Sequence, residues 1–101
     1  MQDVIARREL VAVWPSGERI SFVIEIGRPY PFDDPKDDWK CPVAITLWDH
    51  RTEIGGVDAL QALCLAIRHA RFLLTDFVDQ GGKLLYPDSE DEFDLQTASF
   101  S

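Results

Sequence analysis

Alternating apolar and polar positions near the start of the chain predict two strands. Residues 19–26 place Ile or Phe at every second position, with Ser21 and Glu25 between them. A period of two is typical of an antiparallel strand with one buried face. Residues 4–14 are also rich in β-branched residues, and Pro15-Ser16-Gly17 supplies residues that tight turns favour. The two runs therefore predict a β-hairpin.

Residues 27–39 interrupt the pattern and predict a loop, because they contain three prolines and four aspartates. Apolar residues return at alternate positions over 40–48 and predict a third strand. Pro42 lacks a backbone N–H, which favours a position at a sheet edge or at the start of the strand. Residues 49–56 are expected to form a polar connection.

The strongest periodic signal predicts one long helix over residues 58–80. Asp58 is a suitable N-cap, Gln61 follows at the capping-box spacing, and Gly81-Gly82 suits the C-terminal end. Such a helix is roughly 35 Å long, and a nine-residue strand is about 30 Å long, so one helix can cover the sheet. The apolar stripe that is expected to face the sheet consists of Leu60, Leu63, Cys64, Ile67, Ala70, Leu74, Phe77 and Val78.

These elements predict an α+β fold. Its antiparallel sheet has three to four strands in the order β-β-β-α-β, packed on one long helix, with residues 83–86 as the short last strand. The length of 101 residues suits one domain. We therefore predict a single α+β domain over residues 1–87 and an acidic C-terminal tail over residues 88–101, in which Phe93, Leu95 and Phe100 offer apolar anchors.

One helix covers only one face of a sheet, and the other face is expected to be mixed rather than polar. It is expected to carry Val23, Ala44, Trp48 and Trp14. Exposed apolar rows are typical of contact surfaces. The tail, the loop over residues 30–39 or a second copy of the chain would cover this face, and the last of these predicts a homodimer.

The net charge of −8 is unevenly distributed, since five of the 18 acids follow Pro87 and all ten bases precede it. Such a chain is repelled by nucleic acid phosphates and by anionic membranes, so neither is expected as a partner. The opening residues lack the apolar run of a secretory signal. Cys41 and Cys64 are expected to be buried free thiols, which fits a reducing compartment. We predict a cytoplasmic protein.

No residue pattern indicates catalysis, a cofactor or a metal ion. Cys64 precedes His69 by one turn and one residue, so the two would not face each other well. The run Asp33–Asp38 lacks the alternation, the glycine and the distal glutamate of a calcium loop. Gly55-Gly56 lacks the neighbours of a phosphate-binding loop. We predict no catalytic residue, no cofactor and no metal site.

Three segments carry a resemblance: Ile26–Tyr30 (IGRPY), Asp38–Val43 (DWKCPV) and Gly56–Leu63 (GVDALQAL). Together they resemble a family of small uncharacterised bacterial proteins, over most of residues 20–85. The resemblance implies a bacterial cytoplasmic protein with a compact α+β domain, and it implies no catalytic residues.

Two functions remain open. The first is a non-catalytic protein-interaction module that acts on a protein partner, such as a basic one neutralised by charge complementarity, or as a homodimer. Its expected interaction surface consists of Tyr30, Asp38, Trp39, Trp48 and His50, because exposed aromatic residues near acids often form contact surfaces. The alternative is a small-molecule-binding or enzymatic domain with a site in the region of residues 28–50.

Overall fold

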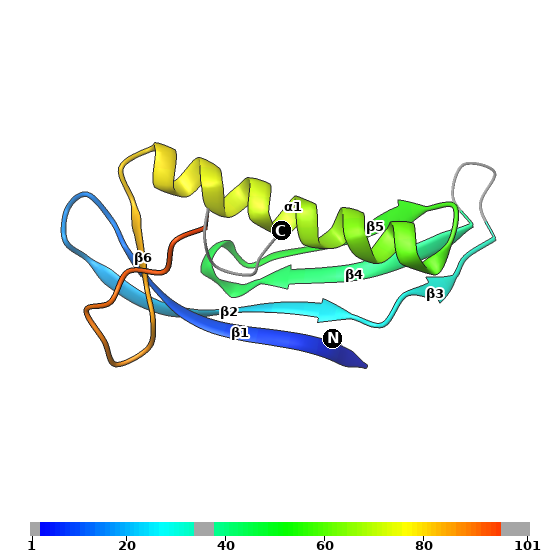
Figure 1. Cartoon of the computed structure of the whole chain (residues 1–101), viewed down its shortest axis with the longest axis horizontal. Coiled ribbons are helices and arrows are strands. Elements are labelled where there is room, and N and C mark those ends of the chain that lie inside the picture. The colour runs from blue at the N-terminus through cyan, green and yellow to red at the C-terminus, as the bar shows by residue number, and fades with distance from the viewer. Residues whose placement is uncertain (1–2, 34–37, 96–101) are drawn as a thin grey trace.

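A computed structural model describes residues 3–33 and 38–95 of the chain as an antiparallel sheet with one helix along it (Figure 1). The α+β class with one helix on an antiparallel sheet is confirmed, whereas the expected three to four strands are wrong, because the sheet has six. The elements are β1 (Val4–Val13), β2 (Arg19–Gly27), β3 (Tyr30–Pro31), β4 (Trp39–Ile45), the 3-10 turn η1 (Thr46–Trp48), β5 (His50–Gly56), α1 (Ala59–Asp79) and β6 (Lys83–Leu85).

Strand β4 lies inside the sheet, not at an edge as Pro42 suggested. One side of β4 pairs with β5, and the other side is shared by β2 and β3. Opposite Pro42 this second ladder is interrupted, because β2 pairs with residues 43–45 and β3 with residues 39–40. A proline inside the sheet is therefore placed beside a break in the hydrogen-bonded ladder.

Strand β5 replaces the polar connection that was expected over residues 49–56. It pairs with β4 along its whole length, from Ile45 opposite His50 to Trp39 opposite Gly56. The polar composition of β5 fits a strand with one face open to solvent, since Arg51 and Glu53 are exposed while Ile54 packs against the core. The preceding turn closes through Asp49, which has a φ of 51° and donates its N–H to the Thr46 carbonyl at 3.2 Å.

The helix begins and ends as expected. The Asp58 carboxylate accepts a hydrogen bond from the Gln61 N–H at 2.7 Å, and the Gln61 side chain accepts one from the Val57 N–H at 2.8 Å. Gly56 lets β5 and α1 approach closely, because a Cβ there would lie 2.6 Å from the Ala62 nitrogen. At the other end Gly81 has a φ of +99°, which glycine adopts without strain.

The face of α1 that packs on the sheet is lined by alanines. Ala62, Ala66 and Ala70 are fully buried, and Leu74 and Phe77 extend the same face. The expected stripe was partly wrong, since Leu60 is 69% exposed and Val78 and Cys64 are exposed as well. Small side chains let the helix axis lie close to the strands, so leucines at the boundary are turned outward.

The segment after β6 completes the core beside α1. Phe93 and Leu95 are buried, and the Phe93 N–H donates to the Leu84 carbonyl at 2.8 Å. The Phe93 ring packs edge-to-face on Tyr86, with ring centroids 5.4 Å apart, and the Arg8 guanidinium lies 4.8 Å from its centroid. Residues 92–95 therefore contribute apolar groups to the same core as the strands. Phe100 lies outside the described residues.

The expected mixed surface on the face of the sheet opposite α1 was partly wrong. Trp14 and Trp48 both pack edge-to-face on Phe77 of α1, with ring centroids 5.3 and 6.1 Å away, and so lie on the helix side. On the open face of the sheet, Arg7 forms ion pairs with Glu9 at 2.7 Å and with Glu25 at 3.9 Å.

No helix in the described ranges is long and apolar enough to cross a membrane.

Candidate functional site

The five residues of the expected interaction surface lie in two groups. Tyr30, Asp38 and Trp39 lie at the β3 end of the sheet, whereas Trp48 and His50 lie at the other end of the β4–β5 hairpin. The register shows this, because Trp39 pairs with Gly56 and Ile45 pairs with His50. Six residues of strand separate the groups, which is about 20 Å. The structure therefore does not bring the five together on one continuous surface.

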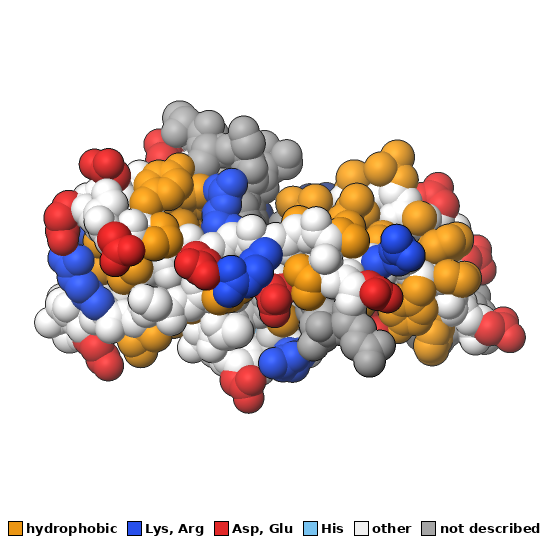
Figure 2. Space-filling model, turned by 90° about the horizontal axis from the view of Figure 1, so that it is seen from below, with side chains coloured by type: hydrophobic (Ala, Val, Ile, Leu, Met, Phe, Trp, Pro, Cys, Tyr) orange, Lys and Arg blue, Asp and Glu red, His pale blue; other side chains and the backbone are white. Residues whose placement is uncertain are grey.

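The β3 end holds an aromatic cluster and a hollow beside it. The Tyr30 hydroxyl donates to the Glu53 carboxylate, which raises the pKa of Tyr30 to about 12. Tyr30 also packs edge-to-face on Phe32. Hydrophobic side chains gather at this end of the molecule (Figure 2). The hollow has a volume of about 480 Å³ and is lined by Asp3, Arg28, Tyr30, Pro42, Val43, Arg51, Thr52 and Glu53.

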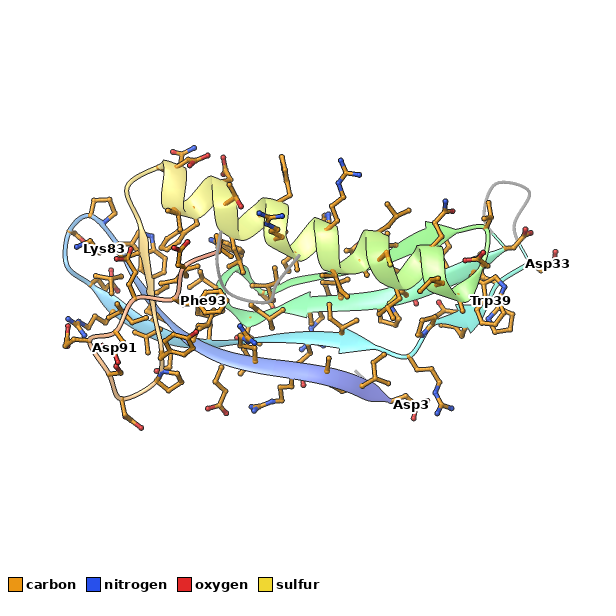
Figure 3. All side chains as sticks on the ribbon, viewed as in Figure 1. Asp3, Asp33, Trp39, Lys83, Asp91 and Phe93 are labelled. Atoms are coloured by element: carbon orange, nitrogen blue, oxygen red, sulfur yellow. The ribbon has the colours of Figure 1, made fainter. Side chains whose placement is uncertain are left out.

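The opposite end holds a groove between the last turns of α1 and residues 92–95, which we name the acidic groove. Its volume is about 480 Å³, and its lining consists of Thr75, Val78, Asp79, Glu92, Phe93, Asp94 and Leu95. Three apolar residues and three carboxylates therefore line it, and none of these seven residues is a base. Figure 3 shows Phe93 and Asp91 at this end and Trp39 and Asp33 at the other.

The acids at this end of the molecule differ in their ion pairing. Arg19 forms a bidentate pair with Glu90, at 2.9 and 3.0 Å, which lowers the pKa of Glu90. Within residues 3–33 and 38–95, Asp79 and Glu92 form no such pair. The last turn of α1 contains no base, although a helix C-terminus favours positive charge. Negative charge therefore accumulates where the helix dipole already opposes it.

His50 and His69 meet between β5 and α1. Their Nε2 atoms are 3.0 Å apart, and their ring centroids are 5.2 Å apart. Burial, and secondarily repulsion from His50, lower the pKa of His69. One neutral ring then donates to the other. Sequence reasoning missed this pair because it placed His50 in a loop, and only the register of β5 brings the two rings together.

The lowered pKa of His69 predicts a loss of stability on acidification. Its unfolded-state pKa is the ordinary 6.5, so the unfolded chain binds more protons just below that value. In metal-free buffer the free energy of unfolding should decline as the pH falls from about 7 to about 5.5, above the range in which most carboxylates titrate. Urea unfolding of the protein and of His69→Gln measures this. The variant should decline less, and equal declines would contradict the prediction.

The two cysteines differ in their exposure to solvent. The Cys41 thiol is buried and donates to the Gly27 carbonyl at 3.4 Å, and burial raises the pKa of this thiol. Cys64 is exposed, contrary to expectation, because it lies on the outer side of α1. In the part of the chain that the structure describes, no three or more His, Cys, Asp or Glu side chains are grouped as a metal site.

Comparison with known proteins identifies the family. No curated protein and no solved structure matches the chain. A sequence profile for a domain of unknown function, DUF6968, matches residues 6–96, which includes the buried residues Phe93 and Leu95. The resemblance to an uncharacterised family is thereby confirmed. Because the match covers most of the sequence, this chain belongs to the DUF6968 family.

Proposed function

We propose that this protein is a non-catalytic interaction module of the bacterial cytoplasm that binds a basic surface of a partner protein through the acidic groove. The observation that carries the proposal is the combination in one groove of an apolar lining, Val78, Phe93 and Leu95, with the carboxylates of Asp79, Glu92 and Asp94. Apolar area supplies affinity, and the surrounding charges select a basic partner and accelerate its approach.

The local conflict between charge and helix dipole supports this proposal. Asp76 and Asp79 lie in the last turn of α1, where negative charge costs about 0.3–1 kcal/mol per residue. Departures from such local rules are expected at functional positions, where binding compensates for lost stability. A Lys or Arg of a partner would supply the positive charge that the helix end lacks.

The thiols fit the proposed compartment. Cys41 and Cys64 are both free, and Cys64 is exposed. An exposed free thiol persists in a reducing cytoplasm and is at risk of oxidation outside it.

Self-association of the chain is an alternative use of the acidic groove. The molar mass of the protein in solution reports it directly.

Neutralising the acidic groove should weaken partner capture. The variant Asp79→Asn/Glu92→Gln removes two negative charges and is expected to lose about tenfold in affinity, at up to about 1 kcal/mol per exposed charge. The same variant should unfold at slightly higher urea, because the helix end is relieved. The measurement is capture from a bacterial lysate at low salt, followed by titration of each purified captured protein.

The matched control is Asp3→Asn/Asp33→Asn, which changes the charge equally at the opposite end of the molecule (Figure 3). It should bind like the original protein. Captured proteins should be basic and should be released at about 1 M salt, where the Debye length falls to about 3 Å. Equal capture by the groove variant, or capture that persists in high salt, would contradict the proposed interface.

The hollow at the β3 end favours a second candidate function, the binding of a small anionic molecule. Arg28, Arg51 and Thr52 line it together with the Tyr30–Glu53 pair. Two guanidinium groups suit a carboxylate or phosphate, although Asp3 and Glu53 balance their charge. Thermal unfolding with small carboxylates and phosphate, compared with Arg51→Gln, separates this candidate from the first, because the acidic groove is at the other end.

A further inference from the structure

Two imidazoles are held at a fixed separation on two different elements. His50 is the first residue of β5 and pairs with the fully buried Ile45, so its backbone is fixed by the sheet. His69 precedes the fully buried Ala70 in the middle of α1, so its backbone is fixed by the helix. The core that joins α1 to β4 and β5 therefore determines the distance between the two rings before any ligand binds.

We propose that His50 and His69 form a two-histidine site for a divalent transition-metal ion such as Zn²⁺, which links α1 to β5. Imidazole nitrogen is a preferred ligand of zinc, copper and nickel. Two nitrogens at the usual Zn–N distance of about 2.0–2.1 Å in a tetrahedral site lie about 3.3 Å apart. The Nε2 atoms are 3.0 Å apart, so a small rotation of the side chains creates this spacing.

Metal binding requires only a change of tautomer. In the hydrogen-bonded pair one ring carries its proton on Nε2 and the other ring accepts it. When that proton moves to Nδ1 of its own ring through water, both Nε2 lone pairs point toward the shared position. The metal then forms two Nε2–metal bonds in place of one hydrogen bond, with no net release of protons.

The site differs from a structural zinc site in being open. Because no third His, Cys, Asp or Glu joins the pair among the described residues, water fills the remaining positions. Such a site is weaker than a four-ligand site and exchanges its metal readily. The sequence predicted no metal site because two histidines 19 residues apart carry no ligand-spacing signal until β5 is recognised. This inference is independent of the acidic groove.

The test is thermal unfolding of the tag-free full chain with added Zn²⁺. A ligand that binds only the folded state stabilises it, so zinc at about ten times its dissociation constant should raise the Tm by about 5 °C or more. Mg²⁺ prefers oxygen ligands and should therefore leave the Tm unchanged. The rise should be lost in His50→Asn and in His69→Gln. It should persist in Cys64→Ser, which removes the exposed thiol of α1, five residues before His69.

A second measurement needs no variant. The chain contains only two histidines, so its imidazole ¹⁵N resonances report this pair alone. Zinc should shift the Nε2 resonances of both rings together. The proposal is overturned if zinc leaves the Tm and these resonances unchanged, if the rise survives in both histidine variants, or if it disappears in Cys64→Ser.

Discussion

Replacing Phe93 by alanine is expected to lower the free energy of unfolding by about 3–5 kcal/mol, the usual cost of deleting a buried phenylalanine. Phe93 is 2% exposed, and its ring contacts Tyr86 and the Arg8 guanidinium. Its removal leaves a cavity beside β6 and loosens residues 92–95. The whole free energy of unfolding of a small domain is about 5–15 kcal/mol, so the variant should be close to unfolding at body temperature. Urea unfolding monitored by circular dichroism measures the change.

Phe72→Ala is the matched control for Phe93→Ala. It deletes the same side chain from the outer side of α1, where Phe72 is 69% exposed, and should change stability by less than about 0.5 kcal/mol. If the two variants unfolded at the same urea concentration, residues 92–95 would not belong to the core. The acidic groove would then lose its apolar lining, and the proposed interface would lose its basis.

Replacing Ala66 by leucine is expected to cost about 1–3 kcal/mol through overpacking. Ala66 is fully buried between Ala62 and Ala70 on the face of α1 that packs on β4 and β5. A leucine there has no space unless the helix moves away from the strands. The shift would also separate His69 from His50, so the imidazole resonances of the two rings should change together. Thermal unfolding and histidine NMR spectra measure the two effects.

The reverse substitution on the same helix is the control. Leu60→Ala removes a large side chain that is 69% exposed and should leave the Tm almost unchanged. Hydrophobicity alone predicts the opposite order, because leucine is the more apolar residue. A larger loss for Leu60→Ala than for Ala66→Leu would show that α1 is rotated about its axis relative to the structure described above.

The fold class and the helix could be predicted because their signals are local. The alternation in β2, the Asp58 cap and the glycines after Gln80 lie within a few residues of the structures they specify. The rotation of α1 could not be predicted in this way. A period of 3.6 identifies an apolar sector of the helix that contains both alanines and leucines. Which of them lie at the centre of the buried face depends on the distance between the helix and the strands.

The two surfaces at the ends of the sheet depend on register, which the sequence specifies weakly for β5. Its polar residues resemble a connection because α1 covers only one face of this strand, and the side chains on the other face are exposed. Without β5, His50 was assigned to a polar connection after the third strand, and the His50–His69 contact had no basis. The acids after Pro87 were visible in the sequence, but the groove they border requires the packing of Phe93.

The partial pairing of β1 has a consequence for behaviour at high concentration. Strand β6 pairs only with residues 11–13 of β1, so the described chain leaves the outer backbone of the first half of β1 open to strand addition. That half carries a bulge between Val4 and Ala6 and the consecutive charges Arg7, Arg8 and Glu9. Bulges and charges at such positions discourage the growth of intermolecular sheets. The first half of β1 therefore leaves an unpaired sheet edge, and its bulge and charges protect that edge from ordered aggregation.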